Sequence, residues 1–244
     1  MNLTHISRIA AMIVLVVAIT QVGCTGDEAQ PEEAEMAEAV EDAQMEVQPQ
    51  MPPSFVYIQH GVADFDAWLP VYDAFGDERD AAGVVAMWVY RDLDDPSIVH
   101  ALHGASDVAA LEAFTQMPEL ASGMQEAGVV GEPRFDFMNI VTETIPEAPI
   151  ASEYNILVKH EVADWDAWKE AYDGHAEARA AAGLTSRGVA RDAENPNVVY
   201  INFAASDLDG ARAFLGSEDL KSTMEAAGVV GEPEIYVTET VQSM

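Results

Sequence analysis

Two histidines, His60 and His160, are placed where an imidazole could act as a general base or contact a ligand. Each comes near the end of a short segment rich in β-branched and aromatic residues, which predicts a strand. Because side chains alternate along a strand, His60 lies on the same apolar face as Ile58 and Val62, and His160 occupies the equivalent position in the second segment. We name His60 and His160 as the candidate catalytic residues. The alternative is a hydrogen-bonded histidine that holds the turn before the following helix.

Each histidine is followed by a stripe of aromatic and basic side chains with the three- and four-residue spacing of one helix face. We name six of these side chains as candidate ligand-binding residues: Trp68, Tyr72, Arg79, Trp168, Tyr172 and Arg179. An arginine at such a place could bind the carboxylate of a small ligand through two parallel hydrogen bonds. The alternative is that the tryptophans pack in the core and that each arginine lays its stem on the core and pairs with an acidic side chain.

The sequence contains no motif typical of a metal, cofactor or nucleic-acid site. His100 and His103 are three residues apart on a predicted strand, so they point to opposite faces and do not share a metal. The segment after His160 lacks the second histidine of a zinc-protease motif, because Asp164 stands there. The only cysteine, Cys24, excludes an intrachain disulfide and a multi-cysteine site. With 43 acidic and 11 basic residues, the formal net charge of −32 argues against binding to nucleic acid. We expect no metal and no cofactor.

The folded part of the sequence is a tandem duplication. Residues 56–134 align without a gap with residues 156–234, and 33 of those 79 positions are identical. The segment AGVVGEP occurs unchanged at 127–133 and at 227–233. We therefore predict five segments: a signal peptide (1–24), an acidic disordered tether (25–53), a first repeat (54–144), a linker (145–153) and a second repeat (154–244).

Both repeats show the same order of predicted elements. The first repeat has a strand over 55–62, a helix capped by Asp64 that ends at Gly83, strands over 84–92 and 98–103, a second helical segment capped by Ser106 and broken near Pro118, and a final strand near 134–142. This β-α-β-β-α-β order is that of a ferredoxin-like unit. Its antiparallel sheet leaves one face uncovered, and the second copy is the natural partner for that face. The predicted fold class is α+β, with two tandem units that pack their sheets into one intramolecular α/β barrel, a pseudo-dimer within one chain.

This arrangement over residues 55–240 resembles the dimeric α/β-barrel superfamily, which includes antibiotic-biosynthesis-monooxygenase-like proteins. The resemblance depends on the element order and the duplication rather than on a diagnostic motif. The superfamily includes cofactor-free monooxygenases, haem-degrading enzymes and isomerases, so the fold alone implies little about function. Haem-degrading members use an Asn, Trp and His set that does not map onto this sequence.

The two repeats differ at several positions of their second and third predicted strands. The differing pairs are Met87 and Arg187, Trp88 and Gly188, Tyr90 and Ala190, His100 and Tyr200, and His103 and Phe203. If positions 88 and 188 meet near the pseudo-twofold axis, the tryptophan could fill the space left by the glycine. The functional alternative is a single pocket that is lined by aromatic residues of the first repeat and polar groups of the second.

Residues 1–24 are expected to direct the protein out of the cytoplasm. An apolar run from Ile9 to Ile19 is too short to span a bilayer core of ~30 Å comfortably, and Gly23 stands directly before Cys24. This end resembles the lipobox of bacterial lipoproteins, which implies cleavage before Cys24 and lipidation of this residue. The implied location is the outer membrane, facing the periplasm or the cell surface, with the lipid at Cys24 as the membrane contact. An ordinary secretory signal and an uncleaved anchor are the alternatives.

From these features we expect an envelope lipoprotein that binds a small apolar or aromatic molecule in a barrel cavity. The first alternative is a cofactor-independent monooxygenase-like enzyme. In that enzyme His60 or His160 would be the base, and the tyrosine of the same repeat, Tyr72 or Tyr172, would orient the substrate. The second alternative is a structural or partner-binding envelope protein.

Overall fold

The computed structural model describes residues 51–147 and 150–243, which belong to one compact unit. The predicted signal peptide, the predicted lipidation site Cys24 and residues 25–50 of the predicted tether lie outside the described residues.

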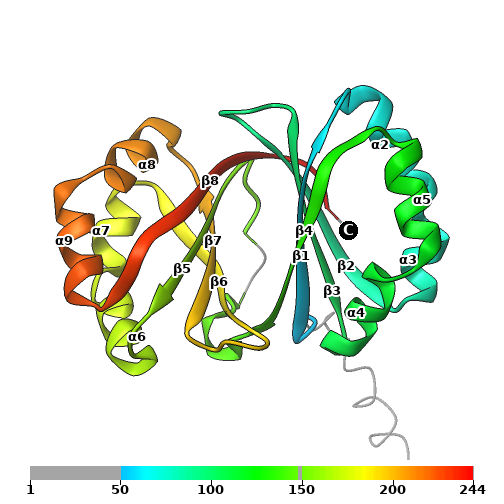
Figure 1. The fold of residues 1–244 in the computed structure, drawn as a ribbon. Helices are drawn as coiled ribbons and strands as arrows, with labels where there is room; N and C mark the ends of the chain where they lie inside the picture. Colours follow the sequence, from blue (N-terminus) through cyan, green and yellow to red (C-terminus); the bar gives the residue numbers. More distant parts are fainter. Residues whose placement is uncertain (1–50, 148–149, 244) are drawn as a thin grey trace, which may run out of the picture. The chain divides into compact units, whose positions relative to one another are not determined.

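The two repeats fold into matching sets of elements (Figure 1). The first repeat consists of β1 (Ser54–Val62), α2 (Phe65–Ala74), α3 (Gly76–Ala81), β2 (Val84–Asp92), β3 (Ile98–Ala105), α4 (Val108–Thr115), α5 (Pro118–Glu126) and β4 (Val129–Ile140). A short 3-10 helix, η2 (Thr142–Thr144), follows it. The second repeat consists of β5 (Tyr154–Val162), α6 (Trp165–Gly174), α7 (Ala176–Ala181), β6 (Leu184–Asp192), β7 (Val198–Ala205), α8 (Leu208–Leu215), α9 (Glu218–Ala226) and β8 (Val229–Ser243).

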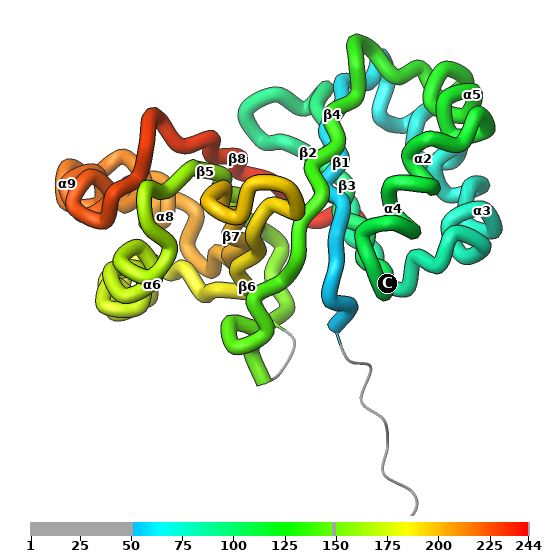
Figure 2. Tube along the Cα trace, turned by 60° about the horizontal axis from the view of Figure 1, so that its bottom comes forward, coloured from blue at the N-terminus to red at the C-terminus, as the bar shows by residue number. Residues whose placement is uncertain are grey.

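The strands of both repeats join into one closed antiparallel barrel in the order β1-β3-β2-β8-β5-β7-β6-β4. The repeats are joined twice, because β8 pairs with β2 and β4 pairs with β6. Figures 1 and 2 show the two sheets facing each other in the middle, with each repeat's helices on its outer side. The predicted α+β fold and its intramolecular barrel are confirmed.

The helices and strands begin largely where the sequence indicates, with three differences. Asp64 Oδ1 accepts a hydrogen bond from the Ala67 amide at 3.1 Å and so caps α2 as predicted. The predicted helix to Gly83 is broken at Phe75 into α2 and α3. The cap of α4 is Asp107 rather than Ser106, because the Asp107 carboxylate accepts from the Ala110 amide at 2.9 Å. The final strands begin at 129 and 229, earlier than expected.

Hydrophobic cores lie on both faces of the sheets. On the outer face of each sheet, strand residues pack against helix residues such as Trp68 and Leu111 in the first repeat and Trp168 in the second. A separate cluster lies between the two sheets and draws side chains from both repeats. Within the described ranges, no helix combines the length and the apolar character needed to cross a membrane.

Candidate functional site

The structure places the residues predicted from sequence on the outer, helix-covered faces of the sheets. In the first repeat, His60, Trp68, Tyr72 and Arg79 come together around a small cavity of about 40 Å³. In the second repeat, the equivalent side chains form a separate cluster in which His160, Trp168 and Tyr172 lie in a row. The predicted residues thus form two clusters, one per repeat, rather than a shared site.

The two predicted histidines are buried and poorly hydrogen-bonded. The ring of His60 lies 5.6 Å from that of Trp68, and its Nδ1 is 3.3 Å from the Gly61 carbonyl oxygen. Neither ring nitrogen of His160 has a hydrogen-bond partner among the described residues. Burial lowers the pKa of His60 and lowers the pKa of His160 to about 4. Both imidazoles are therefore neutral at neutral pH, and His160 does not fit the hydrogen-bonded alternative.

The two predicted arginines bind backbone carbonyl groups where the first helical segment of each repeat is broken. Arg79 Nη1 donates to the Tyr72 carbonyl oxygen at 2.7 Å, and its guanidinium lies 4.2 Å from the centre of the Tyr72 ring. Arg179 repeats both contacts with Tyr172. Among the described residues, neither arginine forms an ion pair with a carboxylate. The alternative prediction that each arginine pairs with an acidic side chain is therefore wrong. The guanidinium instead satisfies a backbone carbonyl near the end of the helix and stacks on an aromatic face.

A second histidine completes the outer cluster of the first repeat. Tyr72 Oη lies 2.7 Å from His103 Nε2, and Tyr72 stacks on Trp68 with ring centres 4.8 Å apart. Burial, together with the nearby charge of Arg79, lowers the pKa of His103 to about 3. In the second repeat, where position 203 is phenylalanine, Tyr172 donates instead to Ser186 Oγ at 3.0 Å. These contacts show that the outer clusters of both repeats are closely packed and leave little free space.

A much larger cavity, of about 410 Å³, lies inside the barrel between the two sheets. Its wall is mostly apolar, and it draws on both repeats and on the connection between them. The first repeat contributes Arg134 and otherwise large apolar and aromatic side chains: Phe55, Tyr57, Trp88, Tyr90, Leu102, Met138 and Ile140. The second repeat contributes a more polar set at the equivalent strands: Leu157, Val158, Lys159, Arg187, Gly188, Ala190, Tyr200, Ile201, Asn202, Tyr236 and Thr240. This lining agrees in part with the pocket that the differences between the repeats suggested. Arg134 of the first repeat and Val158 and Ile201 of the second depart from that division.

The simpler packing interpretation of position 188 needs correction. A Cβ added to Gly188 would meet Ile140 Cδ1 at 3.1 Å, so the space beside this glycine is occupied by Ile140. Trp88 packs instead near Phe55 of its own repeat, with ring centres 6.2 Å apart.

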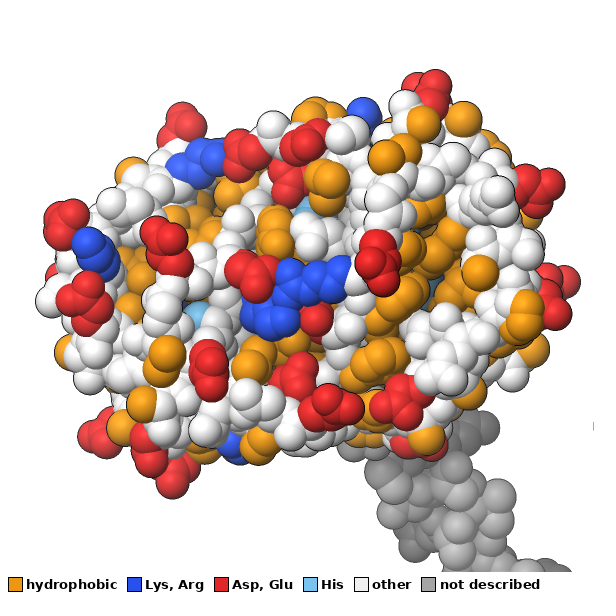
Figure 3. All heavy atoms as spheres, viewed as in Figure 1, with side chains coloured by type: hydrophobic (Ala, Val, Ile, Leu, Met, Phe, Trp, Pro, Cys, Tyr) orange, Lys and Arg blue, Asp and Glu red, His pale blue; other side chains and the backbone are white. Residues whose placement is uncertain are grey.

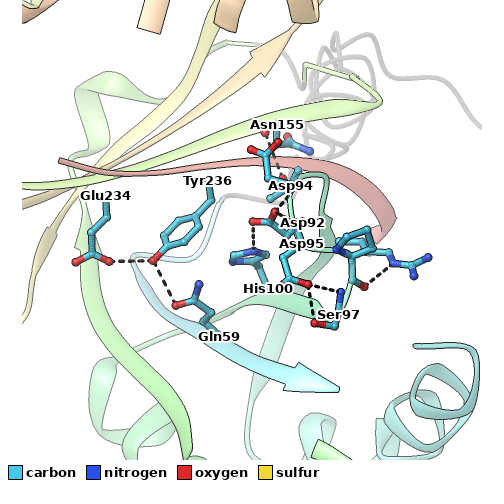
Figure 4. Close-up of polar contacts among 12 residues, drawn as sticks. Gln59, Asp92, Asp94, Asp95, Ser97, His100, Asn155, Glu234 and Tyr236 are labelled. Carbon is cyan, nitrogen blue, oxygen red and sulfur yellow. Dashed lines mark hydrogen bonds and ion pairs between the residues drawn. The ribbon is translucent and has the colours of Figure 1, made fainter. Parts of the chain in front are cut away.

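A chain of buried polar groups stands behind the cavity wall. Tyr57 Oη lies 2.5 Å from His100 Nδ1. His100 Nε2 lies 3.2 Å from Asp92 Oδ2, a contact that Figure 4 shows. Burial raises the pKa of Tyr57, so its hydroxyl keeps its proton. The Asp92 carboxylate accepts from His100 Nε2, which leaves Nδ1 as the atom to which the Tyr57 hydroxyl can donate. Burial alone would raise the pKa of Asp92, but hydrogen bonds from His100 and two backbone amides outweigh it and lower the pKa. The second repeat lacks this histidine, and Tyr200 donates directly to Asp192 at 3.0 Å.

One end of the barrel carries a charged network that joins the repeats. Arg134 pairs with Glu234 at 2.5 Å and with Asp136 at 2.8 Å, and Lys159 pairs with Asp136 at 3.2 Å. Tyr236 donates to Glu234 at 3.0 Å and turns toward Gln59 (Figure 4). Figure 3 shows Lys and Arg side chains grouped in the middle of this face, with acidic side chains around them. Arg134 and Lys159 of this network line the central cavity, and both are paired with carboxylates.

No family model matches the chain, and no curated protein matches it in sequence. Solved structures do match in fold. An anthrone oxidase-like protein has a TM-score of 0.58 at 14% identity, covering 79% of this chain and 92% of its own. A candidate monooxygenase from Lactobacillus acidophilus gives 0.53 at 12% identity, covering 79% of this chain and 95% of its own. A candidate chlorite dismutase has a TM-score of 0.55 at 12% sequence identity, and the match covers 79% of this chain and 96% of that protein. The fold is a fused dimeric α/β barrel.

The residues of this fused barrel can be compared with what a metal or haem would need. Among the described residues, no group of three or more His, Cys, Asp or Glu side chains is arranged to hold a metal ion. The described lining of the central cavity includes no histidine, and both ring nitrogens of the nearest one, His100, are engaged by Tyr57 and Asp92. The cavity wall therefore does not offer an imidazole ligand to a haem iron.

Sequence reasoning missed most of the residues that line the central cavity of the barrel. The candidate ligand-binding residues are side chains that the two repeats share, whereas the cavity is lined by side chains that differ. Six of these are named from the sequence only as members of differing pairs: Trp88, Tyr90, Arg187, Gly188, Ala190 and Tyr200. Phe55 faces Asn155 in the alignment, Tyr57 faces Leu157, and Leu102 faces Asn202. Reading the differences at alternate strand positions would have located the cavity wall, because those positions share one face of the sheet.

Proposed function

We propose that the barrel binds a small apolar or aromatic molecule in its central cavity. The observation that carries the proposal is the cavity itself, about 410 Å³ of space with a mainly apolar wall. Ligand sites in proteins are typically concave, mostly apolar and supplied with a few polar groups, and cores seldom leave such a volume empty. The described structural relatives establish the fold alone, so the proposal depends on the geometry of this chain.

The proposal is tested by binding of a neutral naphthalene dye, phenylnaphthylamine, which fluoresces in apolar surroundings. The protein is residues 25–244, which include the whole barrel. The cavity-filling variant is Ala190→Tyr, because the first repeat has Tyr90 at the equivalent place. Its control is Ala180→Tyr on the exposed surface of α7. We expect saturable binding to the wild type and to Ala180→Tyr, and binding at least about tenfold weaker in Ala190→Tyr. Equal binding to all three would place the dye elsewhere and contradict the proposal.

The second candidate is a monooxygenase-like enzyme. It is favoured by one observation: the neutral His60 imidazole borders the small outer cavity beside Tyr72. That cavity, at about 40 Å³, has room for a few water molecules rather than an aromatic substrate, which is why this candidate ranks second. The test is oxygen consumption with electron-rich phenols, for which His60→Gln should abolish turnover while dye binding in the barrel is retained.

We also propose that the protein is a lipoprotein held outside the cytoplasm by a lipid at Cys24. The supporting observation is the sequence before this residue, an apolar run followed by Gly23-Cys24. Growth with radioactive palmitate should label the wild type in the outer-membrane fraction. Cys24→Ala should be unlabelled and should not be processed, whereas a variant that is processed and released normally would show an ordinary secretory signal.

A further inference from the structure

Arg187 reaches the central cavity because a β-bulge sits at a different place in the two repeats. In β2 the extra residue is Val85, since Val84 pairs with Ala105 and Ala86 pairs with Gly104. In β6 the register shifts between Ser186 and Gly188, so the extra residue is Arg187 itself. A bulge redirects the side chain it contains.

Because the bulge lies at different places, the equivalent residues Met87 and Arg187 point to opposite faces of their sheets. Met87 pairs with His103 and therefore shares the outer, helix-covered face, because paired residues of antiparallel strands point the same way. Arg187 instead lines the barrel interior. Gly188 makes the bulge possible with a φ of 154°, a conformation that favours glycine.

A chain of hydrogen bonds holds the Arg187 guanidinium in place. Its Nη1 donates to Asn155 Oδ1, and Asn155 Nδ2 in turn donates to Thr240 Oγ1 at 2.6 Å. The Thr240 hydroxyl donates to the Ser152 carbonyl oxygen at 3.1 Å. The equivalent residues of the first repeat are Met87, Phe55 and Ile140, so the whole set is polar in one repeat and apolar in the other.

No acidic partner of the Arg187 guanidinium lies within residues 51–147 and 150–243. The other two basic side chains of the cavity wall, Arg134 and Lys159, are paired with carboxylates, whereas Arg187 forms no ion pair with any described residue. Its Nε also has no hydrogen-bond partner among them. A charge in an apolar cavity is costly unless an opposite charge or strong acceptor accompanies it. A bound anion would supply that partner.

Two neutral groups stand beside the guanidinium. Asn202 Nδ2 lies 3.4 Å from Tyr90 Oη, and the Asn202 Oδ1 atom has no partner among the residues described. Tyr90 is almost fully buried, and burial raises its pKa against the opposing effects of Asn202 and Arg187, so its hydroxyl stays protonated. The Tyr90 hydroxyl and the Arg187 guanidinium are therefore both hydrogen-bond donors in the wall of the same cavity.

We propose that the ligand of the central cavity is a small carboxylic acid with an apolar or aromatic body, whose carboxylate binds Arg187. This inference rests on the proposed function, which it narrows to one chemical class. The aromatic wall of the first repeat holds the body, and the donors of Arg187 and Tyr90 hold the acid, while Asn202 donates to the Tyr90 hydroxyl oxygen. An arginine fork suits a carboxylate because its donors match the two oxygens in one plane.

The test compares naphthoic acid with naphthamide, which have the same ring but differ in charge. Each competes with phenylnaphthylamine for the wild type, Arg187→Met, Arg187→Lys and Arg212→Met. Methionine is the residue that the first repeat carries at this position, and Arg212 is a surface arginine outside the cavity that controls for the loss of one charge. We expect the wild type and Arg212→Met to bind the acid about tenfold or more tightly than the amide. Arg187→Met should lose that preference and still bind the dye and the amide, with Arg187→Lys intermediate.

Two failures can be told apart. If the dye and both naphthalene compounds fail to bind the wild type, the proposed function is wrong and this inference falls with it. If they bind but the acid is not preferred, or if Arg187→Met keeps the preference, the cavity is a ligand site and the assignment of Arg187 is overturned.

Discussion

His160 is expected to lower the stability of the folded protein at acidic pH, because its buried ring has no hydrogen-bond partner among the described residues. Its pKa is about 4 in the folded protein, against about 6.5 for an unfolded histidine. Between these two values the unfolded chain binds more protons than the folded one, so the free energy of unfolding falls as the pH falls.

We predict that His160→Leu removes this dependence. Relative to the variant, the wild type should lose on the order of 2 kcal/mol between about pH 7 and pH 4.5, at ~1.4 kcal/mol per pKa unit. Urea unfolding at several pH values measures the difference, and the other titrating groups cancel in the comparison. Parallel pH profiles for the two proteins would contradict the prediction.

The Tyr57–His100–Asp92 chain predicts a coupled pair of substitutions. His100→Tyr alone copies Tyr200 of the second repeat but leaves the Tyr57 ring in its way, and we expect a loss of about 2 kcal/mol of stability. Adding Tyr57→Leu restores the pairing of the second repeat, where Leu157 stands, and should recover at least half of the loss. Urea unfolding of both single variants and the double variant gives the coupling. Strictly additive effects would show that the two positions do not act together.

At the scale of elements, the bulge in β6 depends on Gly188. An alanine there would have to adopt a φ of 154° and would place its Cβ 3.1 Å from Ile140. We predict that Gly188→Ala lowers stability by about 1–3 kcal/mol. Gly174→Ala, at the end of α6 where an added Cβ would meet no heavy atom within 4 Å, should be neutral or stabilising by about 0.4–1 kcal/mol. Thermal unfolding compares the two, and equal effects would argue against a strained bulge.

The elements themselves were largely predictable, whereas the bulge was not. Alternation, the Asp64 and Asp164 caps and the breaks near Pro118 and Ser217 are local signals, and the structure follows them. The two repeats align without a gap, so nothing in their spacing shows that β2 and β6 place their extra residue differently. The side-chain direction of Arg187 depends on that register and could not be read from the sequence.

At the scale of the whole unit, fusing two copies allows pairings that a symmetric dimer cannot make. Positions 134 and 234 are equivalent in the two repeats, yet they carry Arg134 and Glu234, which contact each other. In a dimer of identical chains both positions would hold the same residue and the same charge. The barrel could be inferred from the duplication and the uncovered sheet face, but this complementarity shows how the duplicate has since diverged.

We predict that Arg134→Glu destabilises the barrel by about 1 kcal/mol, a modest amount because both side chains are partly exposed. The charge exchange Arg134→Glu with Glu234→Arg should recover part of the loss, and the effect should shrink in high salt. Thermal unfolding at low and high ionic strength measures both. No recovery in the exchanged variant would show that the pairing across the repeats contributes nothing.

The most direct test of the account is a crystal structure of the wild-type protein with a brominated naphthoic acid, located by the anomalous signal of bromine. We expect one bromine site between the two sheets, close to the aromatic wall of the first repeat, with the carboxylate at Arg187. A bromine site on the outer face beside His60 and Trp68, or at the protein surface, would contradict it.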